Sequence, residues 1–191
     1  MRIISGRYRG RLITTLKSGK LRPTSDQLRE TLFDVLGPGI VGARLLDAYA
    51  GSGAVGLEAL SRGAADVVFI EHHRAAAVLI RKNLEALGIK SGYRLVTSDV
   101  LDGLERLGEE AARFDYVFLD PPYTEIREYH HALRQLARGR LLGPDSLVVA
   151  EHSRHTQLED GYGALARVRL LRHGDAQLAF YRLAAEPPPA P

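Results

Sequence analysis

Cysteine is absent from this chain of 191 residues. The protein therefore cannot form disulfides or thiolate metal sites, and it cannot use a mechanism that needs a cysteine nucleophile. The chain also lacks any run of the ~18 apolar residues that would span a bilayer. Its start, Met1–Gly6, lacks the longer apolar core of a signal peptide. These absences favour a cytoplasmic protein, and we expect it to be a monomer.

Acidic residues are missing from positions 1–22, and the first 30 residues have a net charge of +6, which leaves −3 for the rest. Concentrated positive charge attracts a polyanion such as nucleic acid. A solvated basic segment without a partner is the alternative. We expect residues 1–24 to be a binding extension, in which strands at 2–5 and 11–15 form a β-hairpin with a basic tip. The bases expected to contact phosphate are Arg2, Arg7, Arg9, Arg11, Lys17 and Lys20.

Short apolar runs alternate with longer amphipathic ones in the remaining sequence. This βαβα order predicts a single α/β domain over residues 25–183, with a mostly parallel sheet covered on both faces. Two final β-type segments without a helix between them predict an antiparallel pair at the C-terminal edge, and residues 184–191 are expected to be a disordered tail. The expected strands are 44–47, 67–71, 94–97, 116–119, 147–150, 166–171 and 177–183, and the expected helices are 25–36, 55–62, 75–87, 101–112 and 128–138.

A glycine-rich turn follows the first of these strands. Gly51, Gly53 and Gly56 fit G-x-G-x-x-G between a strand and a helix, and Glu71 ends the next strand. Glycines let the backbone pass close to a ligand. A carboxylate at the position of Glu71 can accept hydrogen bonds from both hydroxyls of a ribose. The pattern predicts a site for a nucleoside cofactor.

Two features favour S-adenosylmethionine over a dinucleotide such as NAD. A dinucleotide turn usually begins at the strand end, whereas here three residues separate Asp47 from Gly51. The Asp47 carboxylate would also repel a pyrophosphate, but it suits the positive amino group and sulfonium of S-adenosylmethionine. Ser98 and Asp99, after the third strand, are expected to meet the adenine. A glycine turn that binds nothing is the remaining alternative.

Asp120-Pro121-Pro122-Tyr123 stands at the carboxyl end of the fourth strand, the edge at which open α/β sheets bind ligands. An amino group on a base is a poor nucleophile because its lone pair is delocalised into the ring. The Asp120 carboxylate and the Pro121 carbonyl can accept its hydrogens and localise that lone pair, while proline stiffens the turn. Tyr123 can stack on a flipped-out base. A rigid turn with a packed tyrosine is the alternative.

The motif thus predicts methylation of an exocyclic amine on a nucleic-acid base. The absence of cysteine counts against methylation at C5 of a pyrimidine, which commonly uses a thiolate adduct. No metal is expected, because the seven histidines lack cysteine or carboxylate partners at metal spacing.

A set of motifs spread over residues 1–183 is shared with one protein family. The most specific are Leu21-Arg22-Pro23-Thr24 and Arg29-Glu30-Thr31-Leu32-Phe33. Further matches are Arg2-Ile3-Ile4-Ser5-Gly6, Arg9-Gly10-Arg11, the segment from Asp47 to Gly53, Gly56-Leu57-Glu58-Ala59-Leu60-Ser61-Arg62-Gly63-Ala64 and Asp120-Pro121-Pro122-Tyr123. In these motifs the sequence resembles the bacterial RsmD-type 16S ribosomal RNA guanine-N2 methyltransferases.

This resemblance implies a Rossmann-like class I methyltransferase fold with a seven-stranded sheet and an N-terminal hairpin. It implies methyl transfer to N2 of a guanine in 16S ribosomal RNA, on the small ribosomal subunit or an assembly intermediate. It also implies that the segment 22–29 folds over the cofactor, although Arg22 and Arg29 could equally bind RNA phosphate. The residues expected to bind the cofactor are Arg22, Thr24, Arg29, Asp47, Ala50, Gly51, Ser52, Gly53, Gly56, Glu71, His72, Ser98, Asp99 and Val100.

Three other functions remain open at this stage. An adenine-N6 methyltransferase uses the same four-residue motif, but the chain leaves no obvious space for a separate target-recognition region. A protein glutamine methyltransferase is expected to carry Asn rather than Asp at the position of Asp120. A non-catalytic RNA-binding assembly factor would retain the fold without the reaction.

Overall fold

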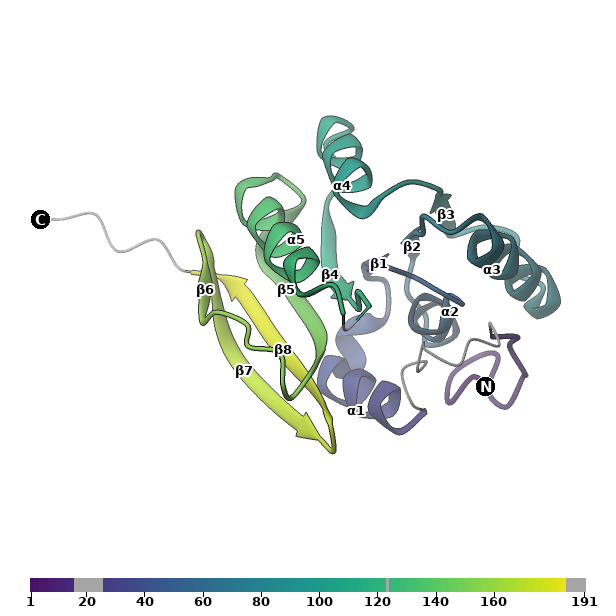
Figure 1. Ribbon diagram of the computed structural model, residues 1–191. Coiled ribbons are helices and arrows are strands. Elements are labelled where there is room, and N and C mark those ends of the chain that lie inside the picture. Colours follow the sequence, from purple (N-terminus) through teal and green to yellow (C-terminus); the bar gives the residue numbers. More distant parts are fainter. Residues whose placement is uncertain (16–25, 123, 185–191) are drawn as a thin grey trace, which may run out of the picture.

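The computed structural model describes residues 1–15, 26–122 and 124–184. Within these residues, one eight-stranded sheet has the strand order β3-β2-β1-β4-β5-β8-β7-β6 (Figure 1). Neighbours from β3 to β5 in this order are parallel, whereas β8, β7 and β6 pair in antiparallel fashion. The strands are β1 (Arg44–Ala48), β2 (Asp66–Ile70), β3 (Tyr93–Val96), β4 (Phe114–Leu119), β5 (Leu142–Ser153), β6 (Gly161–Tyr162), β7 (Leu165–His173) and β8 (Ala176–Leu183).

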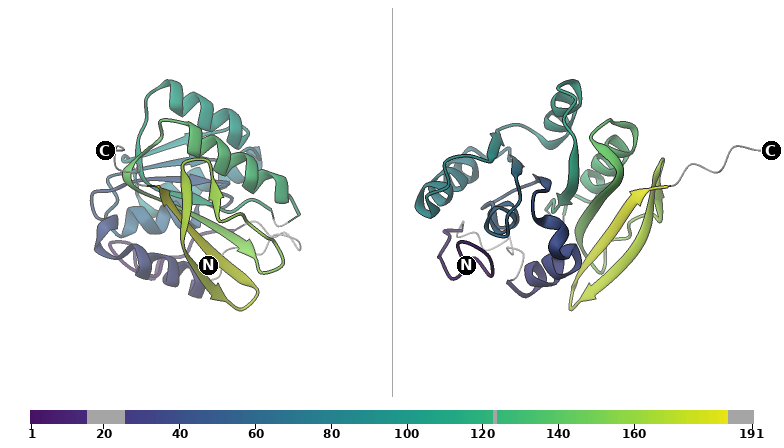
Figure 2. Two further views of the ribbon diagram at one scale, coloured as in Figure 1. Left: turned by 90° about the vertical axis from the view of Figure 1, so that its left-hand side faces the viewer. Right: turned by 180° about the vertical axis from the view of Figure 1, so that it is seen from behind.

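Helices cover both faces of this sheet (Figures 1 and 2). They are α1 (Asp26–Leu36), followed directly by the 3-10 helix η1 (Gly37–Ile40), then α2 (Ala54–Ser61), α3 (Arg74–Leu87), α4 (Val100–Glu109) and α5 (Ile126–Arg138). Alternation along the strands separates two cores. On β1, Leu45 packs with α1, α2 and α3, whereas Leu46 packs with α4 and α5. Both faces of the parallel strands are therefore buried, as βαβ connections require.

The predicted α/β class, with a mostly parallel sheet and an antiparallel C-terminal edge, is confirmed. Every predicted strand from position 44 onward and every predicted helix is present, with ends that differ by a few residues. The sheet has eight strands instead of the seven that the resemblance implied, because the two-residue strand β6 pairs with β7. Such a short pair has no detectable alternation of its own.

The N-terminal hairpin is present as an antiparallel return of the chain, but it is not a pair of regular strands. Its ladder is reduced to the bridge between Arg2 and Leu12, supported by backbone hydrogen bonds from Ile3 to Arg11 and from Ile13 to Met1. Figure 1 shows this segment beside α2 and α3. The pairing alone is too short to hold the segment in place, so its position depends on contacts with the helices.

Several predictions fall outside the described residues. These concern the loop 16–25 and the tail from 185, and the division into an extension of 1–24 and a domain of 25–183 stays a prediction. Across the part of the chain that is described, no helix has both the length and the apolar character needed to cross a bilayer. The predicted site residues that lie outside are Lys17, Lys20, Arg22, Thr24 and Tyr123.

Candidate functional site

A cavity of about 340 Å³ opens at the edge of the sheet where the parallel strands end. The loops after β1, β2, β3 and β4 reach this edge together with the first turns of α4 and α5. Open α/β sheets bind ligands at this edge. The residues that line the cavity are Tyr49, His72, Asp99, Val100, Leu101, Asp102, Pro122, Glu125 and Glu128.

The glycine turn between β1 and α2 leaves room for a ligand at Gly51. Gly51 and Gly53 have positive φ values of 55° and 77°, which glycine adopts without strain. A Cβ atom on Gly51 would find the Tyr49 carbonyl oxygen as its nearest non-adjacent atom, 4.0 Å away. The Ala50 amide donates to the Ile70 carbonyl at 3.0 Å and so ties the turn to the end of β2. The backbone at Gly51 is thus both fixed and approachable.

Glu71 lies directly below this turn. Its side chain is almost fully buried, and its two carboxylate oxygens accept the amide hydrogens of Gly51 and His73, each at 2.7 Å. The neighbouring His72 ring is exposed to the cavity, with Nδ1 3.6 Å from the Glu71 carboxylate. The predicted carboxylate at the end of the second strand is therefore in place beside the glycine turn, in a fixed orientation.

Asp47 supports the turn from beneath and does not line the cavity. It is 2% exposed, and its carboxylate accepts the Gly56 amide hydrogen at 2.9 Å. Burial raises the pKa of Asp47 to about 7, the Gly56 hydrogen bond opposes this rise, and the nearby Glu71 carboxylate adds to it. The sequence predicted a direct partner for the cofactor, whereas the structure gives Asp47 a partner within the protein, at the start of α2.

Gly56 is a packing position, and its predicted place among the cofactor-binding residues stays a prediction. A Cβ atom there would lie 2.2 Å from the Phe69 ring and 2.8 Å from the Val67 side chain. The absence of a side chain lets α2 approach β2 closely. The third glycine of the motif thus serves the contact between helix and strand.

Asn83 is a residue that the sequence analysis missed. It lies on α3, is 2% exposed, and exchanges hydrogen bonds with the backbone of Thr14, accepting at 2.9 Å and donating at 2.9 Å. Its amide nitrogen also donates to the Ser52 carbonyl at 3.1 Å. One side chain thus fastens both the glycine turn and the end of the hairpin to α3. A lone asparagine in a helix carries no sequence signal of such a role.

The residues after β3 also reach the cavity. Asp99 precedes α4 at its N-cap position, yet its side chain makes no capping hydrogen bond and faces the cavity. Val100 lines the same wall. Ser98 is half-buried and donates its hydroxyl hydrogen to the Asp99 carbonyl at 3.0 Å. Asp99 and Val100 therefore reach the cavity, and the predicted contact of Ser98 and Asp99 with an adenine stays a prediction.

The turn after β4, which carries the predicted catalytic motif, reaches the same cavity through Pro122. Asp120 is half-buried, Pro121 is buried, and Pro122 lines the cavity. The hydroxyl group of Tyr129, on α5, donates to the Pro121 carbonyl at 3.2 Å. The glycine turn and the motif, about 70 residues apart in the sequence, are therefore neighbours at one edge of the sheet.

Tyr49 and Glu128 form a wall of the cavity that the sequence did not predict. Tyr49 has a φ of 71°, an unusual value for a residue other than glycine. Its hydroxyl donates to the Glu128 carboxylate at 3.1 Å. Burial, together with the carboxylates of Glu128 and Glu125, raises the pKa of Tyr49. The position of Tyr49 directly before the glycine turn was the available signal.

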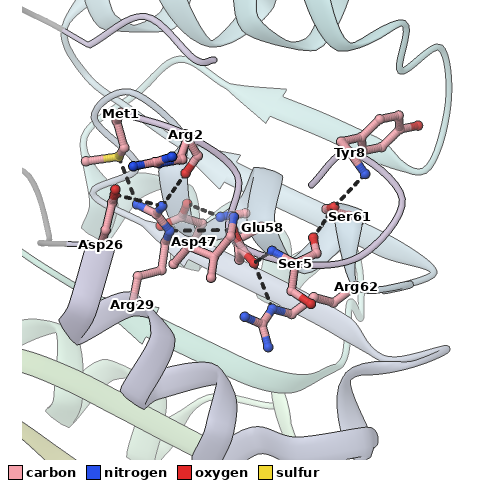
Figure 3. Close-up of polar contacts among 12 residues, drawn as sticks. Met1, Arg2, Ser5, Tyr8, Asp26, Arg29, Asp47, Glu58, Ser61 and Arg62 are labelled. Atoms are coloured by element: carbon pink, nitrogen blue, oxygen red, sulfur yellow. Dashed lines mark hydrogen bonds and ion pairs between the residues drawn. The ribbon is translucent and has the colours of Figure 1, made fainter. Parts of the chain in front are cut away.

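Arg29 is not at the cavity, so its predicted contact with cofactor or phosphate is wrong. Its side chain is 0% exposed and lies under the N-terminal segment (Figure 3). The guanidinium donates to the Arg2 carbonyl at 2.6 Å and to the Met1 sulfur at 2.8 Å. It also pairs with Asp26 at 3.0 Å and with Glu58 at 3.6 Å. Through these contacts, the Arg29 side chain connects α1, α2 and the first residues of the chain.

Glu58 and Ser61, both on α2, hold the rest of this segment (Figure 3). The fully buried Glu58 carboxylate accepts the amide hydrogens of Ile4 at 2.8 Å and Ser5 at 3.0 Å. The Ser61 hydroxyl accepts the Tyr8 amide hydrogen at 3.0 Å and donates to the Ser5 carbonyl at 2.5 Å. We call these contacts, together with those of Arg29, the N-terminal clasp. It fixes the basic segment to the helix that begins at the glycine turn.

The clasp leaves four of the predicted RNA-binding side chains, those of Arg2, Arg7, Arg9 and Arg11, at the surface. Arg2, Arg7 and Arg9 are exposed, and no carboxylate of the described residues forms an ion pair with them. Arg11 has a different role, because its guanidinium donates to the carbonyls of Ala86 and Leu87 at the C-terminal end of α3. The four predicted cations that lie in the described residues are therefore all at the surface, and their contact with RNA stays a prediction.

The chain is similar to known proteins along nearly its whole length. The sequence profile of the family described as Conserved hypothetical protein 95 matches residues 1–182. Ribosomal RNA small subunit methyltransferase D of Haemophilus influenzae is 40% identical over 152 residues, which cover 79% of this chain and 78% of that protein. The solved structure of a hypothetical protein from Thermus thermophilus has a TM-score of 0.80 at 30% identity and covers 94% of this chain and 98% of that one.

A more distant likeness concerns SMU.776, a protein solved in complex with SAH. It has a TM-score of 0.67 at 17% identity, over 82% of this chain and 48% of that one. At this level of identity the likeness shows the fold alone.

Proposed function

We propose a function from one premise: the chain belongs to the family described as Conserved hypothetical protein 95, together with ribosomal RNA small subunit methyltransferase D. The proposed reaction is methyl transfer from S-adenosylmethionine to the exocyclic N2 amine of a guanine in 16S ribosomal RNA. The proposed substrate is the small ribosomal subunit or one of its assembly intermediates. The observation that supports this proposal most directly is that the loops after β1 and β4, which carry the glycine turn and the Asp120-Pro121-Pro122 motif, reach one cavity through Tyr49 and Pro122.

The residues around the cavity fit S-adenosylmethionine, which when bound supplies a methyl group activated by a positive sulfonium. The open backbone at Gly51 and the fixed carboxylate of Glu71 suit a ribose with two hydroxyls. Asp99, His72 and Val100 would enclose the adenine. Ala50, Ser52 and Gly53 would shape the turn, which Asp47 supports by accepting the Gly56 amide hydrogen.

The protein's part in the chemistry is to make a weak nucleophile react. In the proposed geometry, the Asp120 carboxylate and the Pro121 carbonyl accept the two hydrogens of the guanine amine and localise its lone pair. The nitrogen forms a bond to the methyl carbon as the bond from that carbon to sulfur breaks. The nitrogen then loses one proton, which Asp120 accepts and passes to water. Pro122 and Tyr123 are proposed to hold the base against the cavity.

The exposed cations of the N-terminal segment support an RNA substrate. Arg2, Arg7 and Arg9 project from a segment that the clasp fixes to α2. Arginine binds phosphate with several directed hydrogen bonds, so such a group can position an RNA strand without reading its sequence. We propose that Lys17 and Lys20 extend this surface.

The experiment that tests the proposal compares substitutions of Asp120, in the turn after β4, and of Asp115, near the start of β4. Asp120→Ala is expected to lower the turnover of small subunits lacking the modification by about 100-fold or more, because one of the two acceptors is lost. Its affinity for S-adenosylmethionine should stay unchanged. Asp115→Ala is the matched control, because Asp115 is exposed and accepts the Arg44 amide hydrogen at the other end of β4.

The product identifies the substrate class. Nucleoside mass spectrometry after the reaction should show N2-methylguanosine. N6-methyladenosine would replace the proposed function with that of an adenine methyltransferase. Tight binding of the small subunit with no methyl incorporation, by a protein that binds the cofactor, would indicate an assembly factor instead.

A further inference from the structure

We propose that Tyr129 is a positioning residue that fixes the Pro121 carbonyl as an acceptor for the target amine. This inference rests on the proposed function, because it concerns the second of the two acceptors named there. Tyr129 lies on α5, eight residues after Pro121, and its hydroxyl donates to the Pro121 carbonyl at 3.2 Å. Its side chain is 0% exposed.

The Pro121-Pro122 turn cannot hold this carbonyl by itself. Neither proline has an amide hydrogen, so the turn lacks the local donors that normally restrain a peptide plane. The direction of the Pro121 carbonyl then depends on rotation about one backbone bond and on its external partners. The Tyr129 hydroxyl is such a partner, supplied by the next helix.

The Tyr129 ring is itself held firmly by the sheet. It belongs to the buried core between α5 and the strands, with Leu119 and Ala150. Its edge meets the ring of His152, on β5, with the ring centres 6.5 Å apart and the planes at 78°. His152 is 2% exposed and is fixed by the carbonyls of Ser153 and Thr156, at 2.9 and 3.1 Å from Nδ1. The hydroxyl position is therefore set by packing from two sides.

The Pro121 carbonyl oxygen can accept a second hydrogen bond in addition to the one from Tyr129. A carbonyl oxygen has two lone pairs, so the bond from Tyr129 leaves one lone pair for an incoming amine hydrogen. A carbonyl that is already oriented needs no rearrangement when charge develops on the amine nitrogen. Tyr129 thereby acts through Pro121 and does not touch the reacting atoms.

Tyr129→Phe removes this hydrogen bond and keeps the ring. We expect kcat for methyl transfer to the small subunit to fall about tenfold, which corresponds to about 1.4 kcal/mol of transition-state stabilisation. The KM for S-adenosylmethionine should not change, because Tyr129 is not among the residues proposed to bind it. A split of this kind separates positioning of the amine from a general loss of folded protein.

The matched control is Tyr181→Phe. Tyr181 is also 0% exposed, belongs to the same core, and donates its hydroxyl hydrogen to a backbone carbonyl, that of Glu159, at 2.9 Å. The two variants lose the same kind of bond and should lose similar stability. When kcat is calculated per folded molecule, only Tyr129→Phe should have a lower value than the unchanged protein.

Three results would contradict the inference, and they can be told apart. Normal turnover by the unchanged protein, with kcat of Tyr129→Phe within about twofold, would overturn the role of Tyr129 alone. An equal loss of kcat in Tyr181→Phe would show that the effect is one of stability. Absence of methyl transfer by the unchanged protein, or a product methylated elsewhere than on an amine, would overturn the proposed function and this inference with it.

Discussion

Single residues in this protein show how surroundings decide what a buried carboxylate does. The Glu58 carboxylate pairs with Arg62 at 2.8 Å and accepts two amide hydrogens, so its charge is well compensated. Asp47 accepts the Gly56 amide hydrogen and has no ion-pair partner among the described residues. Burial therefore raises the pKa of Asp47, whereas the Glu58 carboxylate pairs with Arg62 and holds the N-terminal segment through its hydrogen bonds.

The raised pKa of Asp47 predicts a pH dependence of stability. Because the pKa is about 7 in the folded protein and 3.8 ordinarily, folding favours the protonated form. That contribution is complete below the ordinary value and is lost as pH rises through about 7. Asp47→Asn has no such proton. Between pH 5 and pH 8 we therefore expect Tm of the unchanged protein to fall relative to Asp47→Asn by roughly 5–10 °C.

Thermal unfolding of both proteins at matched pH measures this difference. All other titrating groups are common to the two proteins and largely cancel in the comparison. A difference in Tm that stays constant from pH 5 to pH 8 would show that Asp47 remains ionised throughout.

The sequence predicted those site residues whose place follows from the end of a strand. Glu71, Asp99 and Pro122 each follow a parallel strand, so the topology alone brings them to one edge. The sequence analysis failed for Arg29 because the order of residues along the chain does not show that Glu58 and Asp26 surround the Arg29 side chain. An arginine at this position gives the same sequence pattern whether its side chain is buried or free.

At the scale of elements, the N-terminal clasp replaces the ladder that a regular hairpin would have. The segment crosses α2 so closely that Gly6 has no space for a side chain. A Cβ atom there would lie 1.9 Å from the Ser61 carbonyl oxygen, whereas one on Gly10 would have no atom within 4 Å. Both glycines have the same left-handed backbone, with φ of 79° and 80°.

This pair separates backbone strain from a steric clash. Gly10→Ala should cost about 1–2 kcal/mol of stability from the left-handed conformation alone. Gly6→Ala adds the clash, so we expect it to cost at least about 2 kcal/mol more or to release the segment from α2. Denaturant unfolding measures the first outcome, and faster trypsin cleavage after Arg7 and Arg9 detects the second. Equal behaviour of the two variants would mean that the segment does not lie against Ser61.

The helices and strands after position 44 could be predicted because their apolar periods are long enough to count. The hairpin and β6 could not be predicted in detail. The pairing of Arg2 with Leu12 is one bridge, and β6 has two residues, so neither shows a period. Their geometry depends on neighbours that are distant in the sequence, such as Glu58 on α2.

For the whole molecule, charge is divided between two regions. The first 30 residues carry +6 and the remainder −3, while Asp99, Asp102, Glu125 and Glu128 gather at the cavity. A polyanion is thus attracted to the extension and repelled from the walls of the cavity. For the proposed RNA substrate, such a division would favour entry of a single flipped base over entry of the phosphate backbone.

Substitution of the exposed cations tests this division. Arg7→Ala combined with Arg9→Ala should weaken binding of ribosomal RNA and should reduce the slope of log K against log salt by roughly 1 per arginine. Arg138→Ala combined with Arg140→Ala, exposed cations at the end of α5, is the control and should leave the slope unchanged. Fluorescence anisotropy over a salt series measures both. Equal slopes for the two double variants would show that Arg7 and Arg9 of the extension do not contact RNA phosphate.

The clasp affects which substitutions the exposed basic surface of the N-terminal segment can accept during evolution. On the side of the extension, nearly every hydrogen bond of the clasp is made by main-chain groups: the carbonyls of Arg2 and Ser5 and the amides of Ile4, Ser5 and Tyr8. The side chains of Arg2, Arg7 and Arg9 take no part in holding it. The attachment of the segment to α2 therefore does not depend on which side chains stand at positions 2, 7 and 9. Substitutions at these positions can change the charge of the exposed surface while the clasp stays intact.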